Sequence, residues 1–154
     1  MNALELMEAC RKDVQERDRL KERIGELDFA ITSFPTAFCE IRKGSATDKI
    51  ADFVARKDEL TRNLMQTEDA IAVGILAVFL ITEELPETQR KTVSGYYCYG
   101  KSALSIAQEL NCTVRNIRNA LKLARASMAL VDEKKVEAAL PAWYIEKHNC
   151  DDEL

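Results

Sequence analysis

The side chains best suited to chemistry lie together in a stretch that has no acidic residue from Asn111 to Ser127. Arginine can donate two hydrogen bonds to O6 and N7 of guanine, and asparagine can pair with N6 and N7 of adenine. The candidates for such contacts to base edges in a major groove are Arg115, Asn116 and Asn119. Basic side chains later in the stretch suit phosphates and groove walls. The candidates for that role are Arg118, Lys122 and Arg125.

The net charge of the chain, 22 basic minus 26 acidic residues or −4, hides one strongly basic segment. Residues 1–88 carry 12 Lys and Arg against 18 Asp and Glu, and residues 126–154 carry 3 against 7. Residues 89–125 carry 7 against 1, which gives +6. A basic block between acidic flanks is typical of a nucleic-acid contact confined to one part of a chain.

Two short helices are needed to position these residues. Ser102 can cap a helix over 103–110 and Thr113 can cap the next one, because a hydroxyl oxygen can accept a backbone N–H. Asn111 suits a left-handed turn between them. In the second helix the apolar residues recur at spacings of 3, 4, 3 and 4, which predicts one buried side. These residues are Val114, Ile117, Leu121, Ala124 and Met128. The pattern predicts a helix-turn-helix, with Lys101 and Ser102 placed to hold a DNA backbone.

A basic helix surface can also be no more than a solvated surface. The lack of acids argues against this, because solvated helices usually pair opposite charges at i,i+4. We therefore favour contact with double-stranded DNA. A tyrosine cluster beside Gly95 leaves two interpretations, stacking on bases or covering the core of the module, and we favour the second. The cluster is Tyr96, Tyr97 and Tyr99.

The first half of the chain has the pattern of a long helical hairpin. One helix is expected from Asn2 to about Thr32, with an apolar stripe at spacings of 4, 3, 4 and 3. The stripe is Leu20, Ile24, Leu27, Ile31 and Phe34. The charged stretch Arg11–Arg19 should face water, and Pro35 should break the helix. A second helix is expected from Thr47 or Asp48 to Pro86, and its segment Ala70–Ile81, apolar all round, should be a buried spine.

The expected architecture is all-α, with a hairpin over 1–84, a helix-turn-helix module over 85–130 and a C-terminal helical extension over 131–154. The hairpin could pack on itself or form a homodimer. In the extension, Asp132 can cap a short helix that ends before Pro141, and Trp143–Ile145 should pack on the rest of the chain.

Composition argues against most enzyme classes. There is one histidine, no glycine-rich loop and no set of nucleophile, base and orienting group, so we expect neither catalysis nor a cofactor. The five cysteines include no CxxC pair, and His148 with Cys150 and Asp151 is a poor metal site. The longest uncharged run, Ala70–Thr82, has 13 residues, too few for a membrane span. With no signal peptide pattern at the N-terminus, we expect a cytoplasmic protein.

Residues 85–128 resemble region 4 of bacterial sigma factors. The matching positions are Leu85-Pro86-Glu87, Tyr97, Gly100, Ser102, Ile106-Ala107, Leu110, Ile117 and Leu121. Residues 1–130 as a whole resemble the sigma-like late-gene regulators of phages, the ArpU and RinA type, in which a hairpin with an element like Thr47-Asp48-Lys49-Ile50 precedes the same module. This resemblance implies promoter binding in a bacterial host cell and contact with RNA polymerase. The sequence departs from the pattern, which favours apolar residues, at Lys91, Thr92 and Lys101.

Two other functions remain open at this point. A phage DNA-packaging protein of the small-terminase kind also joins such a module to coiled helices, and would form rings. A protein-interaction adaptor could keep the module without binding DNA.

Overall fold

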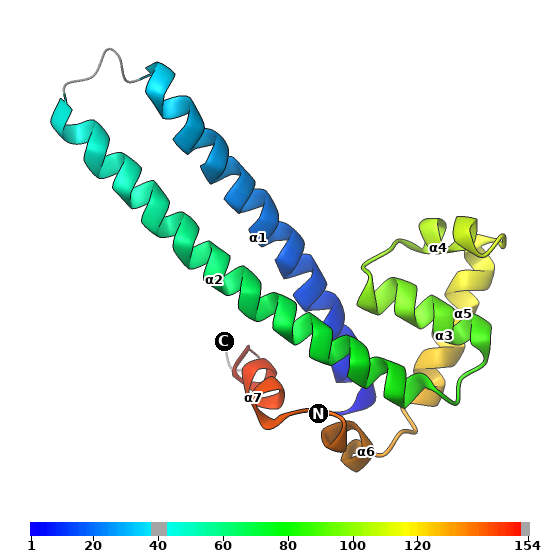
Figure 1. Cartoon of the computed structure of the whole chain (residues 1–154). Helices are drawn as coiled ribbons and strands as arrows, with labels where there is room; N and C mark the ends of the chain where they lie inside the picture. The colour runs from blue at the N-terminus through cyan, green and yellow to red at the C-terminus, as the bar shows by residue number, and fades with distance from the viewer. Residues whose placement is uncertain (38–42, 152–154) are drawn as a thin grey trace. The chain divides into compact units, whose positions relative to one another are not determined.

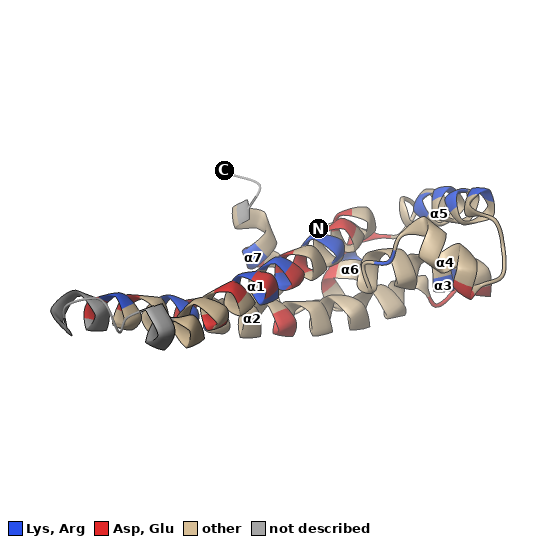
Figure 2. Ribbon diagram, turned by 90° about the horizontal axis from the view of Figure 1, so that it is seen from above, with Lys and Arg blue, Asp and Glu red and all other residues tan. Residues whose placement is uncertain are grey.

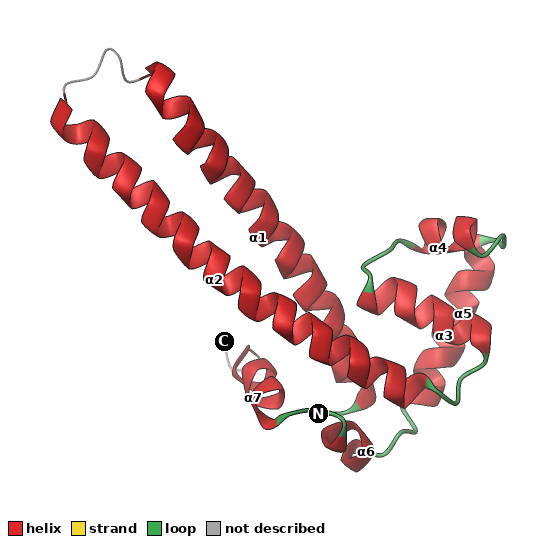
Figure 3. Cartoon of the chain, in the orientation of Figure 1, coloured by secondary structure: helices red, strands yellow, loops and turns green. Residues whose placement is uncertain are grey.

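The computed structural model describes the backbone of residues 1–37 and 43–151, and the side chains of residues 1–33 and 48–150 (Figure 1). Helices account for all the regular structure in these ranges, and none of it is strand (Figure 3). In chain order the elements are α1 (Ala3–Ala37), α2 (Lys43–Thr82), α3 (Glu87–Val93), the π-helix η2 (Ser94–Cys98), α4 (Ala103–Glu109), α5 (Val114–Met128), α6 (Glu133–Ala138) and α7 (Ala142–Asp151). The expected all-α class is confirmed.

The chain forms two compact units. One contains Glu16–Glu68, and the other contains Met1–Gln15 together with Asp69–Leu154. Both boundaries fall within the long helices α1 and α2. The division expected from the sequence, at residues 84 and 130, separates segments by sequence pattern and not by packing. It stays a prediction about which segments carry separate functions.

Within the unit Glu16–Glu68, α1 and α2 form an antiparallel pair. Leu20 and Leu27 of the predicted stripe are buried, Ile24 and Ile31 are half-buried, and Phe34 lies outside the described side chains. Two ion pairs join the helices on the outside, one between Lys21 and Glu68 at 3.5 Å and one between Lys57 and Asp28.

The predicted ends of this hairpin were wrong by about five residues. α1 continues to Ala37, two residues beyond Pro35, and α2 begins at Lys43 rather than Thr47. A proline inside a helix removes one backbone hydrogen bond and crowds the preceding turn, which can kink a helix without ending it.

In the other unit, one apolar cluster joins residues from α1, α2, α3, η2, α5, α6 and α7. Its fully buried large side chains include Leu6, Met7, Val78, Tyr97, Val136 and Tyr144. Gly74 lets Tyr144 approach α2, because a Cβ at position 74 would lie only 2.8 Å from the tyrosine Oη. The core of this unit is therefore assembled from both ends of the chain.

The prediction that Arg11–Arg19 faces water was wrong for its first residues. Val14 is buried, and the Asp13 carboxylate is buried between Lys147 Nζ at 2.7 Å and His148 Nε2 at 3.1 Å, both from α7. Arg11 donates a hydrogen bond to the Tyr96 carbonyl at 2.6 Å, and its guanidinium covers the Tyr96 ring at 3.6 Å. Asp13 thus has a cationic partner from α7, and Arg11 has a carbonyl and an aromatic ring of η2, so both charged groups are compensated by distant segments.

The expected buried spine over Ala70–Ile81 is buried on one side only. Ala70, Ala77 and Val78 are buried, whereas Leu76, Phe79 and Leu80 are 64%, 39% and 56% exposed. Among the described residues, one segment, Asp48–Thr82, contains an 18-residue window that is long and apolar enough to cross a membrane, with 39% of that window buried. The core helix of a soluble protein passes the same test, so this is weak evidence for a membrane span.

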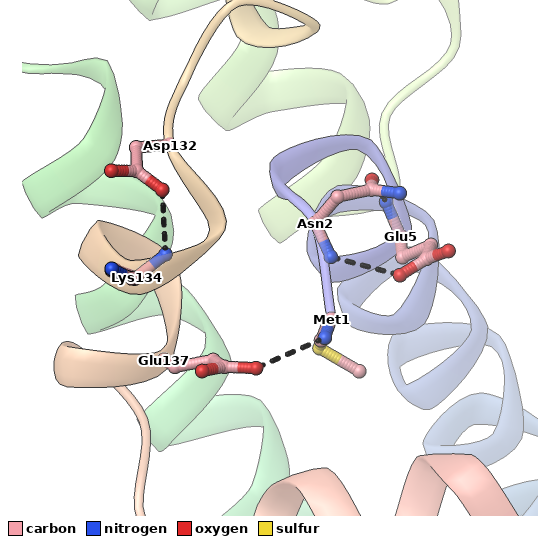
Figure 4. Close-up of polar contacts among 6 residues, drawn as sticks. All are labelled: Met1, Asn2, Glu5, Asp132, Lys134 and Glu137. Carbon is pink, nitrogen blue, oxygen red and sulfur yellow. Dashed lines mark hydrogen bonds and ion pairs between the residues drawn. The ribbon is translucent and has the colours of Figure 1, made fainter.

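The start of the chain contacts α6. Asn2 and Glu5 cap each other at the start of α1, with N–H donations of 2.8 and 2.9 Å (Figure 4). The Met1 amino group lies 3.7 Å from Glu137 of α6, and the predicted cap at Asp132 accepts a hydrogen bond from the Lys134 N–H (Figure 4). After α6 the chain forms α7, which lies within the predicted helical extension although no second helix was placed there. Of the residues expected to pack on the chain, Tyr144 is buried, Ile145 is half-buried and Trp143 is exposed.

Candidate nucleic-acid interface

The segment before α4 is tightly packed against α1. α3 continues into the π-helix η2, and Gly100, two residues after the end of η2, has a φ of +65°. A Cβ at Gly100 would lie 2.9 Å from a methyl carbon of Val14. Both the positive φ and the close approach therefore favour glycine at the turn that leads into α4.

The turn between α4 and α5 has the predicted local chemistry. Ser102 Oγ accepts the Ser105 N–H at 3.1 Å, and Thr113 Oγ1 accepts the Asn116 N–H at 3.2 Å, so both predicted caps are confirmed. Asn111 has a φ of +51° and is the non-glycine residue with positive φ in the described chain. The Cys112 N–H then donates to the Ala107 carbonyl at 3.0 Å and closes the end of α4.

A small apolar cluster fixes α5 against α4. Ile106, Ala107 and Ile117 are buried in it, and Leu110, Cys112 and Leu121 pack around them. Farther along α5, the buried residues are Ala120, Ala124 and Met128. The predicted buried side is therefore confirmed, with Val114 and Leu121 half-buried at its edge and Ala120 as an addition.

Three positions where region 4 of sigma factors favours apolar residues carry Lys91, Thr92 and Lys101 here, and each polar side chain has a partner in the structure. Thr92 is fully buried, and its hydroxyl donates to the Thr88 carbonyl at 2.7 Å. Lys91 pairs with Glu87 at 2.6 Å on the surface, and Lys101 pairs with Glu109 at 2.8 Å. The polar groups at all three positions therefore have partners.

The opposite side of α5 is exposed and carries no acid (Figure 2). Four cations recur at spacings of 3, 4 and 3, which places them on one side of the helix. They are Arg115, Arg118, Lys122 and Arg125, and all four are exposed. Asn116 and Asn119 are also exposed, and Asn119 lies one turn from Arg115. The structure therefore brings together six of the predicted residues on one exposed surface, which we call the α5 surface.

The remaining predicted residues lie at helix ends. Thr113 and Ser102 are exposed cap residues, and each oxygen already accepts a backbone N–H. The Lys101 ammonium is held by Glu109. These three residues position the helices, and Lys101 is less available than the arginines of the α5 surface.

One residue of this surface was missed by the sequence interpretation. Leu123 is 57% exposed and lies one turn after Asn119, on the opposite margin from Arg118 and Arg125. Leu123 is apolar but lies outside the predicted buried stripe of α5. This position in the sequence could have indicated an exposed apolar side chain. The α5 surface thus has one cationic margin and one margin of amide and apolar groups.

Two of the three clustered tyrosines, Tyr96 and Tyr97, pack in the apolar core, which is the interpretation that the sequence favoured over stacking on bases. Tyr97 is fully buried, and burial raises the pKa of its hydroxyl. Tyr96 lies under the Arg11 guanidinium. Tyr99 is exposed and lines a groove of about 810 Å³, here called the apolar groove. Its apolar walls, from α2 and from η2 and α4 with the residues that directly follow them, include Leu76, Phe79, Leu80, Tyr99, Ile106 and Leu110.

The comparisons with known proteins agree with this geometry. Residues 76–128, 53 of the 154, match the family model of sigma-70, region 4. No curated protein and no solved structure matches the chain. The matched range contains the last turns of α2, the whole of α3, η2 and α4, and α5 with its exposed cations. The resemblance to phage late regulators stays a prediction, whereas residues 76–128 form a sigma-70 region 4-like helix-turn-helix.

Proposed function

We propose that this protein is a sequence-specific transcriptional regulator that binds double-stranded DNA through α5. The observation that carries the proposal is the α5 surface, where four cations and two asparagines are exposed on a helix without acids. Helix-turn-helix proteins place their second helix in the major groove, and the width of that groove accepts one α-helix.

Each residue of the surface has a proposed role. The first half of such a helix reaches base edges, which assigns base reading to Arg115, Asn116 and Asn119. Arg118, Lys122 and Arg125 would contact phosphates or the groove wall. Thr113 and Ser102 would hold the helix starts against the DNA backbone, with Lys101 beside them. We infer further that the protein works in the cytoplasm of a bacterial host cell and is encoded by a phage or prophage.

The roles can be tested on a duplex selected from random sequences. Arg115→Ala and Asn119→Ala should relax the preference at particular base pairs, since each removes a contact to a base edge. Lys122→Ala should weaken binding to all sequences alike and reduce the slope of log Kd against log salt by about one. The measurement is fluorescence anisotropy on the selected duplex and its single-base variants, between low and moderate salt.

The same preparations separate the alternatives. Equal losses on all sequences from all three variants would contradict the assignment of roles. Ring-shaped oligomers would favour a DNA-packaging protein, whereas a monomer or homodimer fits a regulator. Association with RNA polymerase without binding to any duplex would favour an adaptor, and the exposed apolar groove offers a surface for such a contact.

A further inference from the structure

Arg125 differs from the other cations of the α5 surface because it already has an acidic partner. Its Nη1 lies 3.6 Å from Oε1 of Glu8 in α1. No ion pair is found for Arg115, Arg118 or Lys122 within the described residues. One of the four cations is thus partly neutralised by the chain itself.

This acid cannot come from α5. No acidic residue occurs from Asn111 to Ser127, and the neighbours of Arg125 four positions away are Leu121 and Ala129. The partner is instead supplied by the start of α1, whose residues up to Gln15 belong to the same compact unit as α5.

Packing, rather than the ion pair, holds Glu8 in this place. Leu6 and Met7 share the apolar cluster with Ala124 and Met128 of α5. The start of α1 is also fixed by its capping box and by the contact of the Met1 amino group with Glu137 (Figure 4). Loss of the carboxylate charge would therefore leave the Glu8 backbone where it is.

The pair is open to competition. The side chains of Glu8 and Arg125 are 46% and 51% exposed, so water screens their attraction. A phosphate at Arg125 would have to displace the carboxylate or lie close to a like charge. Either event weakens DNA binding without regard to base sequence.

We propose that Glu8 is an intramolecular competitor of the DNA backbone for Arg125, and that it lowers the affinity of the α5 surface for every duplex. This inference rests on the proposed function. It assigns to α1 a regulatory role that the helix-turn-helix does not contain.

The test uses Glu8→Gln in the full chain, with Glu146→Gln as the matched control, because Glu146 is an exposed acid of α7 without an ion pair in the described structure. Glu8→Gln should tighten binding about two- to fivefold at low salt and equally on specific and non-specific duplexes, since a screened pair is weak. It should also make the slope of log Kd against log salt steeper, since one more cation becomes available to a phosphate. Glu146→Gln should change Kd less than Glu8→Gln, and neither variant should change the melting temperature.

The double variant Glu8→Gln/Arg125→Ala separates the local contact from general charge. If Glu8 acts through Arg125, Glu8→Gln has no effect when Arg125 is alanine. A gain that persists in the Arg125→Ala background, or that Glu146→Gln reproduces, overturns the inference and leaves the proposed function intact. If neither the wild type nor Glu8→Gln binds any duplex, the proposed function falls and this inference falls with it.

Discussion

Gly74 illustrates how a single missing side chain shapes this molecule. A Cβ there would lie 2.8 Å from Tyr144 Oη and 3.2 Å from Cys10 Sγ, and both neighbours are buried. Overpacking should therefore cost Gly74→Ala about 1–3 kcal/mol of unfolding free energy. Alanine returns about 1 kcal/mol in a helix interior, so we expect a net destabilisation of up to about 2 kcal/mol. Urea unfolding measures the difference.

Two further variants isolate the cause. Tyr144→Phe removes the oxygen nearest the new Cβ, so Gly74→Ala should cost less in that background than in the wild type. Gly25→Ala is the matched control, because a Cβ at this glycine of α1 meets nothing within 4 Å. It should be neutral or stabilising by up to about 1 kcal/mol. An unchanged stability of Gly74→Ala would show that Tyr144 is free to move.

At the scale of the elements, local sequence signals were sufficient for the helix-turn-helix. Ser102, Thr113 and Asp132 each use the side-chain oxygen that makes them good cap residues, and Asn111 adopts the left-handed conformation. These features depend on residues within four positions of one another, so the sequence contains the whole interaction. Helix ends near Pro35 depended on weaker local effects, and there the prediction failed.

The cap at Thr113 provides a test at this scale. Thr113→Ala should cost about 1 kcal/mol of unfolding free energy, because the Asn116 N–H loses its acceptor. Thr113→Ser keeps an oxygen and should stay within about 0.5 kcal/mol of the wild type. Amide hydrogen exchange at Asn116 gives a local readout, with faster exchange expected for alanine alone. Equal exchange in both variants would mean that the threonine hydroxyl does not cap α5.

At the scale of the whole molecule, the contacts that sequence patterns missed all join distant segments. Asp13 is buried because Lys147 and His148 arrive from α7, more than 130 residues later. Leu76 and Leu80 are exposed because no described helix covers that side of α2. Periodicity shows that a helix has an apolar side, but the packing partner of that side is set by the tertiary fold. The exposure of the α5 surface was predictable because it depends on the cations and amides of one helix alone.

The core of the larger unit also couples stability to alkaline pH. A hydrogen bond with Cys98, together with burial, raises the pKa of the Cys10 thiol, and burial raises the pKa of the Tyr97 and Tyr144 hydroxyls. These groups lie in one apolar cluster on α1, η2 and α7. In the unfolded chain they lose their protons near their ordinary pKa values, 9.0 for cysteine and 10.0 for tyrosine, whereas the folded chain retains them.

Above about pH 9 the unfolded state therefore binds fewer protons than the folded state, so stability should fall as the pH rises. Each such group adds about 1.4 kcal/mol per pH unit to the slope once the pH exceeds its unfolded pKa. Tyr144→Phe removes one group and should make the decline between pH 10 and 11 shallower by about that amount. Below pH 8 the difference between variant and wild type should not depend on this titration. Urea unfolding at intervals from pH 7 to 11 measures both slopes, and parallel declines would show that Tyr144 ionises as readily in the folded chain as in the unfolded one.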